Sequence, residues 1–151
     1  MDRPIVVADR IATASAVVAL ESSVLAQGLP VPANLESAEA QSTAVGKAGA
    51  EPAVVGVVAG RIVVGADPGQ VRALASGQVR WKVTVRDLPY VVARGLDGAT
   101  TVSATAFAAE AVGIDPGDKV LFPKDAGYDV RLGGVACKVL RRSELIARVH
   151  D

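Results

Sequence analysis

The sequence predicts an α/β protein, with a partial three-layer α/β/α domain at residues 1–113 and a small all-β tail at 114–151. Two observations predict this class. Short Val-rich runs alternate with Ala-rich helical stretches in the first part, whereas only short strands separated by turns follow it. Half of the residues are hydrophobic but only 3% are aromatic, so we expect a core of Ala, Val, Leu and Ile.

The first buried strand is expected at residues 16–20, because this uninterrupted apolar run is typical of a strand covered on both faces. Pro30 and Pro32 then form a rigid turn. Asn34 is expected to N-cap the helix that follows, and Gly49 lies just past its end.

A hairpin and a second helix are expected next. The apolar runs 53–59 and 62–65 are two strands joined by a tight turn. Asp67 followed by Pro68 is typical of an N-cap with proline at the first helical position, and Gly77 ends that helix.

The first part closes with one more strand and two helices. Residues 79–85 are expected to form the strand and residues 87–93 a short helix. Thr100 or Thr101 caps the last helix, which extends through Val112.

The tail is predicted to contain only strands and turns, apart from one helical turn at residues 143–145. Its strands are expected at residues 119–122, 128–132, 136–140 and 146–149.

Composition excludes several function classes. Sixteen basic and sixteen acidic residues give no net charge, which argues against general binding to nucleic acid or to a membrane surface. The single cysteine, Cys137, with one histidine provides neither an internal disulfide nor a structural zinc site. The longest apolar stretches are too short for a membrane span, and acidic residues interrupt the N-terminus where a signal peptide would need an apolar run. We therefore expect a cytoplasmic protein.

Four segments of the first part, at residues 17–34, 47–65, 82–105 and 109–114, carry a family resemblance. Their LES and RDLP…GATTV blocks, in this order, resemble the N-terminal part of pseudouridine-5′-phosphate glycosidases. The resemblance implies reversible cleavage of a C–C glycosidic bond to give uracil and ribose 5-phosphate. It also implies a Schiff-base lysine, a glutamate acid, a divalent metal (usually Mn²⁺), a sugar-phosphate substrate and a homotrimer.

Five residues are candidates for the site. Glu21 matches the family's proton donor and follows a predicted buried strand, the place where active sites of open α/β sheets lie. The alternative, from its residue type alone, is a carboxylate that lies in solvent at the end of the strand. Lys82 matches a substrate-binding lysine, and Val102 a position whose backbone contacts substrate. Thr100 and Thr101 open a helix whose N–H groups can cradle a phosphate, or they simply cap a packing helix.

After Ile114 the sequence departs from the glycosidase pattern. The family's Schiff-base lysine and metal-binding aspartate do not follow in their contexts, so Mn²⁺ would lack that ligand and no metal ligand is assigned. Because loss of a covalent nucleophile usually costs several orders of magnitude in rate, we expect impaired activity.

The residues that follow instead, 116–134 and 139–149, include PGDKVLFPKDAGYDVRLGG and VLRRSELIARV. They resemble the C-terminal end of GroES-type co-chaperonins, without that family's mobile loop and roof hairpin. The alternative function is therefore an oligomerising or chaperonin-binding module, and a third is a fusion in which neither function survives.

Overall fold

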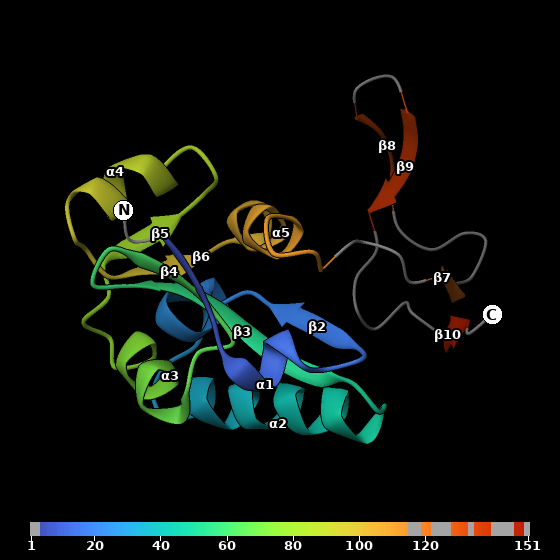
Figure 1. Ribbon diagram of the computed structural model, residues 1–151, viewed down its shortest axis with the longest axis horizontal. Helices are drawn as coiled ribbons and strands as arrows, with labels where there is room; N and C mark the ends of the chain where they lie inside the picture. Colours follow the sequence, from blue (N-terminus) through green and yellow to red (C-terminus); the bar gives the residue numbers. More distant parts are fainter. Residues whose placement is uncertain (1–3, 115–118, 122–127, 133–134, 140–146, 150–151) are drawn as a thin grey trace. The chain divides into compact units, whose positions relative to one another are not determined.

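A computed structural model describes residues 4–114, 119–121, 128–132, 135–139 and 147–149 (Figure 1). The backbone groups into two compact units, Met1–Asp115 and Pro116–Asp151, which are described separately. Side chains are described in the first unit only. No helix among these residues is long and apolar enough to cross a membrane.

The first unit is built on one mixed sheet. Its strands are β1 (Ile5–Val7), β2 (Val17–Leu20), β3 (Glu51–Val58), β4 (Arg61–Val64), β5 (Trp81–Val83) and β6 (Gly98–Thr100). They run in the order β1-β4-β3-β6-β5, and β2 pairs in parallel with β3. The β3–β4 and β3–β6 pairs are antiparallel, whereas β1–β4 and β5–β6 are parallel.

Helices cover both faces of this sheet (Figure 1). They are α1 (Asp9–Ala12), the π-helical turn η1 (Val24–Gly28), α2 (Ala33–Lys47), α3 (Pro68–Leu74), α4 (Leu88–Ala93) and α5 (Val102–Glu110). In Figure 1, α2 and α3 lie on one side of the central strand β3 and α5 on the other.

The alternation of side chains along β3 explains the layers. Val55 and Val57 are fully buried in one core cluster with Ala104 and Ala108 of α5. Val54 points the other way, into a second cluster that includes Ala38 of α2. A strand covered on both faces is expected to be apolar along its buried part, and residues 53–57 of β3 are buried and contain only Ala, Val and Gly. The predicted α/β/α fold class is confirmed.

The structure confirms two of the predicted turn and cap signals of the first unit. Ala59 and Gly60 both have positive φ, so they form the tight hairpin turn between β3 and β4. Asp67 caps α3 and forms a reciprocal capping box with Gln70, with Pro68 in the first turn.

The predicted role of Asn34 is wrong. Pro32 is the N-cap of α2, and Asn34 lies inside the helix with only 2% of its surface exposed. Its amide nitrogen donates to Leu25 O and Ala75 O, both at 2.8 Å. Asn34 therefore links three elements, because buried polar groups take whatever partners the packing supplies.

Other differences concern short elements. The segment 98–100 is a strand, so α5 starts after Thr101, later than one of the two predicted starts. The elements β1, α1 and η1 were not predicted. Each contains five residues or fewer, too short to show a periodic pattern.

The second unit contains two antiparallel strand pairs. β7 (Lys119–Leu121) pairs with β10 (Ala147–Val149), and β8 (Tyr128–Leu132) pairs with β9 (Val135–Val139). These strands overlap the four predicted for the tail, and residues 122, 140 and 146 of those predictions lie outside the described residues. The helical turn predicted at residues 143–145 lies outside the described residues.

Candidate functional site

The carboxyl ends of β2 and β6 meet beside β3. β2 pairs with residues 51–54 of β3, whereas β6 approaches from the opposite direction and pairs with Gly56 and Val57. The N–H of Ser22, just after β2, donates to Thr100 O at 3.1 Å. Residues that directly follow these two strands are therefore brought to one place.

Buried hydroxyl groups fasten this junction. Ser22 and Thr100 are fully buried, and Ser22 Oγ accepts the Thr100 N–H at 2.9 Å. The Thr100 hydroxyl donates to Val55 O at 2.7 Å and lies 2.9 Å from Thr105 Oγ1. Because the Thr100 amide and hydroxyl are both engaged inside the protein, they hold the junction together rather than face outward.

Glu21 lies next to this junction. Its side chain is half-buried, and one carboxylate oxygen accepts a hydrogen bond from Ser23 Oγ at 2.7 Å. Ser23 is itself buried, so its hydroxyl has little freedom to turn away. The carboxylate is thus held by a buried donor at the end of β2, a strand whose residues are only half-buried, unlike the fully covered strand predicted at residues 16–20.

The start of α5 presents backbone donors at the same junction. Thr101 is the N-cap, and its own N–H and hydroxyl both donate to Val83 O, at 2.9 and 3.1 Å. No side chain caps the first turn of α5 in the described part of the chain. Val102, the first residue of the helix, is 71% exposed. Uncapped N–H groups at a helix start attract anions.

Lys82 lies one strand away, on β5. In the sheet it pairs with Ala99, the residue before Thr100, and its side chain is exposed. The structure therefore brings Glu21, Thr100, Thr101 and Val102 together through the Ser22–Thr100 bonds and places Lys82 on the neighbouring strand.

Sequence reasoning missed what Ser22 and Ser23 do. Two consecutive serines shortly after an apolar run were a usable signal, because serine hydroxyls commonly bond to nearby backbone groups and carboxylates.

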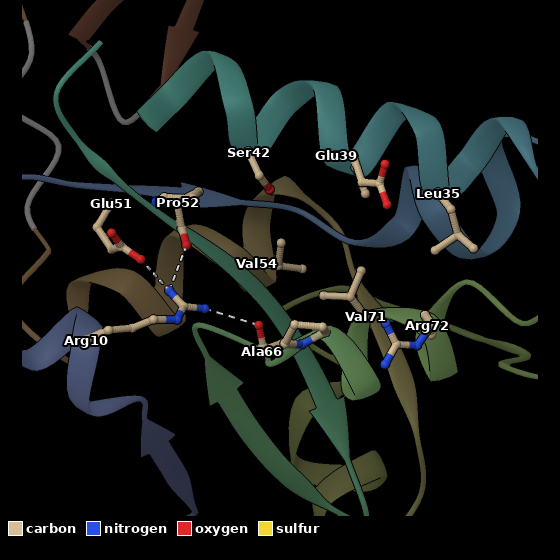
Figure 2. Close-up of a pocket in the computed structure, with 12 residues that line it drawn as sticks. Arg10, Leu35, Glu39, Ser42, Glu51, Pro52, Val54, Ala66, Val71 and Arg72 are labelled. Atoms are coloured by element: carbon tan, nitrogen blue, oxygen red, sulfur yellow. Dashed lines mark hydrogen bonds and ion pairs between the residues drawn. The ribbon is translucent and has the colours of Figure 1, made fainter. Parts of the chain in front are cut away.

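A pocket of about 320 Å³ lies elsewhere, between α2, α3 and β3 (Figure 2). Its floor is apolar and includes Leu35, Val54 and Val71, whereas Glu39 and Arg72 stand at its rim. None of the five predicted site residues lines it.

Arg10, at the edge of this pocket, has a structural role. Its guanidinium donates to Pro52 O, Gly65 O and Ala66 O and forms an ion pair with Glu51 at 3.0 Å (Figure 2). Because both terminal nitrogens of its guanidinium already donate hydrogen bonds, Arg10 fixes α1 to the sheet and is poorly placed to bind a ligand.

No group of three or more His, Cys, Asp or Glu side chains that could hold a metal occurs among the described residues. The hydrogen bond that the described residues make to the Glu21 carboxylate comes from Ser23 Oγ, and one carboxylate beside a hydroxyl is a poor set of ligands for Mn²⁺. The residues present do not fit the Mn²⁺ that the resemblance implies.

Known proteins are similar to this chain over the residues of the first unit. Residues 6–116 match the family model described as indigoidine synthase A like protein. The chain is 53% identical over 98 residues to a pseudouridine-5′-phosphate glycosidase of Rhodospirillum centenum, covering 65% of this chain and 30% of that protein. It is 48% identical over 98 residues to the enzyme of the same name from Saccharopolyspora erythraea, covering 65% and 32%.

Two solved structures share the fold. The prealnumycin C-glycosynthase AlnA, in complex with ribulose 5-phosphate, superposes with a TM-score of 0.67 at 38% identity, covering 76% of this chain and 38% of that one. An indigoidine synthase A-like protein from Thermotoga maritima gives 0.65 at 31% identity, covering 76% and 39%. The chain spans about a third of the length of the curated relatives it matches.

Proposed function

The chain belongs to the family of indigoidine synthase A like proteins, and from this membership we propose that it has a glycosidase-like site for pseudouridine 5′-phosphate with impaired catalysis. One observation carries the proposal. The hydrogen bonds between Ser22 and Thr100 bring the Glu21 carboxylate and the uncapped start of α5 to one junction.

In this proposal the α5 start binds the phosphate of a pentose 5-phosphate. The backbone of Val102 supplies an N–H donor there, and Thr101 orients that turn through its bonds to Val83. Lys82 supplies a positive charge from the neighbouring strand. Thr100 contributes by holding the junction. The ribulose 5-phosphate in the complex with AlnA, a structural relative, agrees with a sugar-phosphate ligand.

Glu21 is proposed as the proton donor to the leaving base. Ser23 holds one of its carboxylate oxygens and so fixes its direction. Covalent catalysis additionally needs a lysine. The lysines whose side chains the structure describes are Lys82 and Lys47, and Lys47 is in the last turn of α2. The proposed impairment follows from the departure of the sequence from the glycosidase pattern after Ile114.

The test is calorimetric titration of the full chain with ribose 5-phosphate, with Lys82→Ala as the site variant and Lys47→Ala as the matched control. Wild type and Lys47→Ala are expected to bind equally, and Lys82→Ala more weakly by about threefold to tenfold. Equal binding heats for wild type and Lys82→Ala would show that Lys82 does not contribute to binding the sugar phosphate.

Catalysis is tested separately by incubating the chain with pseudouridine 5′-phosphate and Mn²⁺ and measuring uracil release. The Rhodospirillum centenum relative is the positive control. Turnover comparable to that control would contradict the proposed impairment.

The remaining expectations rest on the sequence. The division into a glycosidase-like part at 1–113 and a β segment at 114–151 stays a proposal, as do a homotrimer and a cytoplasmic location. The family match ends at residue 116, and the comparisons give the co-chaperonin alternative for the tail no support, so we do not propose it.

A further inference from the structure

We propose that the free edge of β5 binds an extended segment of another polypeptide, in which acidic and apolar residues alternate, as an added strand. This surface goes beyond the proposed phosphate site at the start of α5, with which it shares one residue, Lys82. We define it by Arg80, Trp81, Lys82 and Val83, with Tyr90 of α4 beside them, and call it the β5 edge.

The backbone of β5 offers unpaired groups on one side. β5 is the last strand of the sheet and pairs only with β6 in the described part of the chain. Val83 O accepts the Thr101 N–H, so the backbone of Val83 points toward β6. Along a strand, the backbone N–H and C=O groups of successive residues point alternately to its two edges. Those of Val83 point to β6, so those of Lys82 point to the open edge. Such an unpaired row is a template for another strand.

The protein itself limits the length of this open row. Beyond Val83, the N–H of Thr84 donates to Asp87 Oδ2 at 2.8 Å, and Thr84 O accepts the Asp87 N–H at 3.0 Å. The next amide, of Val85, is directed to Ser103 Oγ. The edge therefore accepts a short segment centred on Lys82 rather than a long strand.

The two faces of the β5 edge differ in chemistry. By the alternation of side chains along β5, Lys82 projects to the face opposite Trp81. Arg80, which directly precedes β5, and Lys82 are both exposed, and neither side chain forms an ion pair or hydrogen bond among the described residues. Trp81 projects to the other face, where its ring lies 5.3 Å from that of Tyr90. Trp81 is 39% exposed and Tyr90 51%, so this aromatic pair presents an uncovered apolar surface.

These two faces specify the partner. Neighbouring side chains on adjacent strands share a face, so residues of the added strand beside Arg80 and Lys82 should be acidic. The alternate residues, beside Trp81 and Tyr90, should be apolar. A second copy pairing through the same edge is disfavoured, because an antiparallel pair centred on Lys82 would bring two lysines together. A nucleic acid has no backbone that can pair with the Lys82 N–H and C=O.

The single tryptophan of the chain, Trp81, makes the test direct. The probe is an acetylated heptapeptide in which Glu and Val alternate, titrated into the full chain while Trp81 emission is recorded. We expect a saturable change that weakens at high salt, together with at least tenfold slower hydrogen exchange at the Lys82 amide. A peptide in which Lys replaces Glu is expected to bind at least threefold more weakly, because exposed charge pairs contribute modestly.

A charge swap tests the specificity. Arg80→Glu should weaken binding of the Glu–Val peptide about threefold to tenfold and should strengthen binding of the Lys–Val peptide. Arg72→Glu, which changes an exposed arginine away from the β5 edge, on α3, is the matched control and should leave binding of both peptides unchanged.

Any of the following would overturn the proposal: no saturable response to the Glu–Val peptide, equal binding of both peptides, a response to oligouridylate in place of peptide, or an unchanged exchange rate of the Lys82 amide. Concentration-dependent dimerisation that Arg80→Glu abolishes would assign the edge to a second copy and would also overturn it.

Discussion

Replacing Asn34 with alanine tests whether one buried amide holds the elements behind the site together. Asn34 donates to Leu25 O in η1 and to Ala75 O at the end of α3, and its own oxygen accepts the Leu35 N–H. η1 directly follows the segment 21–23, so this amide supports the position of Glu21.

The magnitude follows from what alanine leaves behind. Two buried carbonyls lose their donors, and an unsatisfied buried polar group costs about 1–3 kcal/mol. Partial relaxation toward solvent lowers the sum, so we expect a loss of about 3 kcal/mol of unfolding free energy and a fall in Tm of roughly 10 °C. The side chain is only 2% exposed, so water cannot replace it without local opening.

The assay is urea denaturation followed by circular dichroism, with Gln41→Ala as the matched control in α2. Gln41 bonds only to Ser37 one turn away, at 3.1 Å, and such a pair contributes about 0.2–0.5 kcal/mol. A loss below about 1 kcal/mol for Asn34→Ala would refute the reasoning, because it would mean that the two carbonyls find other donors.

Three further substitutions test other contacts. Ser22→Ala removes the acceptor of a buried amide, so we expect a loss of about 1–3 kcal/mol in urea denaturation and weaker binding of ribose 5-phosphate. Gly60→Ala should destabilise by about 2 kcal/mol or more by the same assay, because φ is +73° and a Cβ would lie 2.7 Å from Gly95 Cα. Hydrogen bonds from the Thr84 hydroxyl and amide lower the pKa of Asp87, so its contribution to stability is present above its ordinary value of 3.8 and is lost as the pH falls below it. In Thr84→Val the pKa of Asp87, followed by carboxyl NMR, should rise; an unchanged value would contradict this assignment.

The sequence was informative wherever structure depends on nearby residues. Asp67 and Pro68 define the start of α3, and Gly49, with φ of +82°, ends α2, because caps and left-handed turns are decided within a few residues. The same holds for the hairpin at Ala59–Gly60. The family blocks around Glu21 and Lys82 also supplied the candidate site residues, whose roles stay predictions, but not the hydrogen bonds around them.

Tertiary structure decided which distant groups become partners. Asn34 has the residue type of an N-cap, yet packing buries it between η1 and α3, where its amide satisfies two carbonyls. Ser22 and Thr100 are 78 residues apart, and only the approach of β2 and β6 along the same strand brings them together.

The sequence by itself thus determined the α/β class, the longer elements and the family, because these follow from local periodicity, caps and blocks of residues that resemble the family. The order of strands, the junction beside Glu21 and the free edge of β5 were settled only by the tertiary structure. The physical reason is that hydrogen bonds and burial between distant segments depend on how the whole sheet closes, and no short stretch of sequence encodes that geometry.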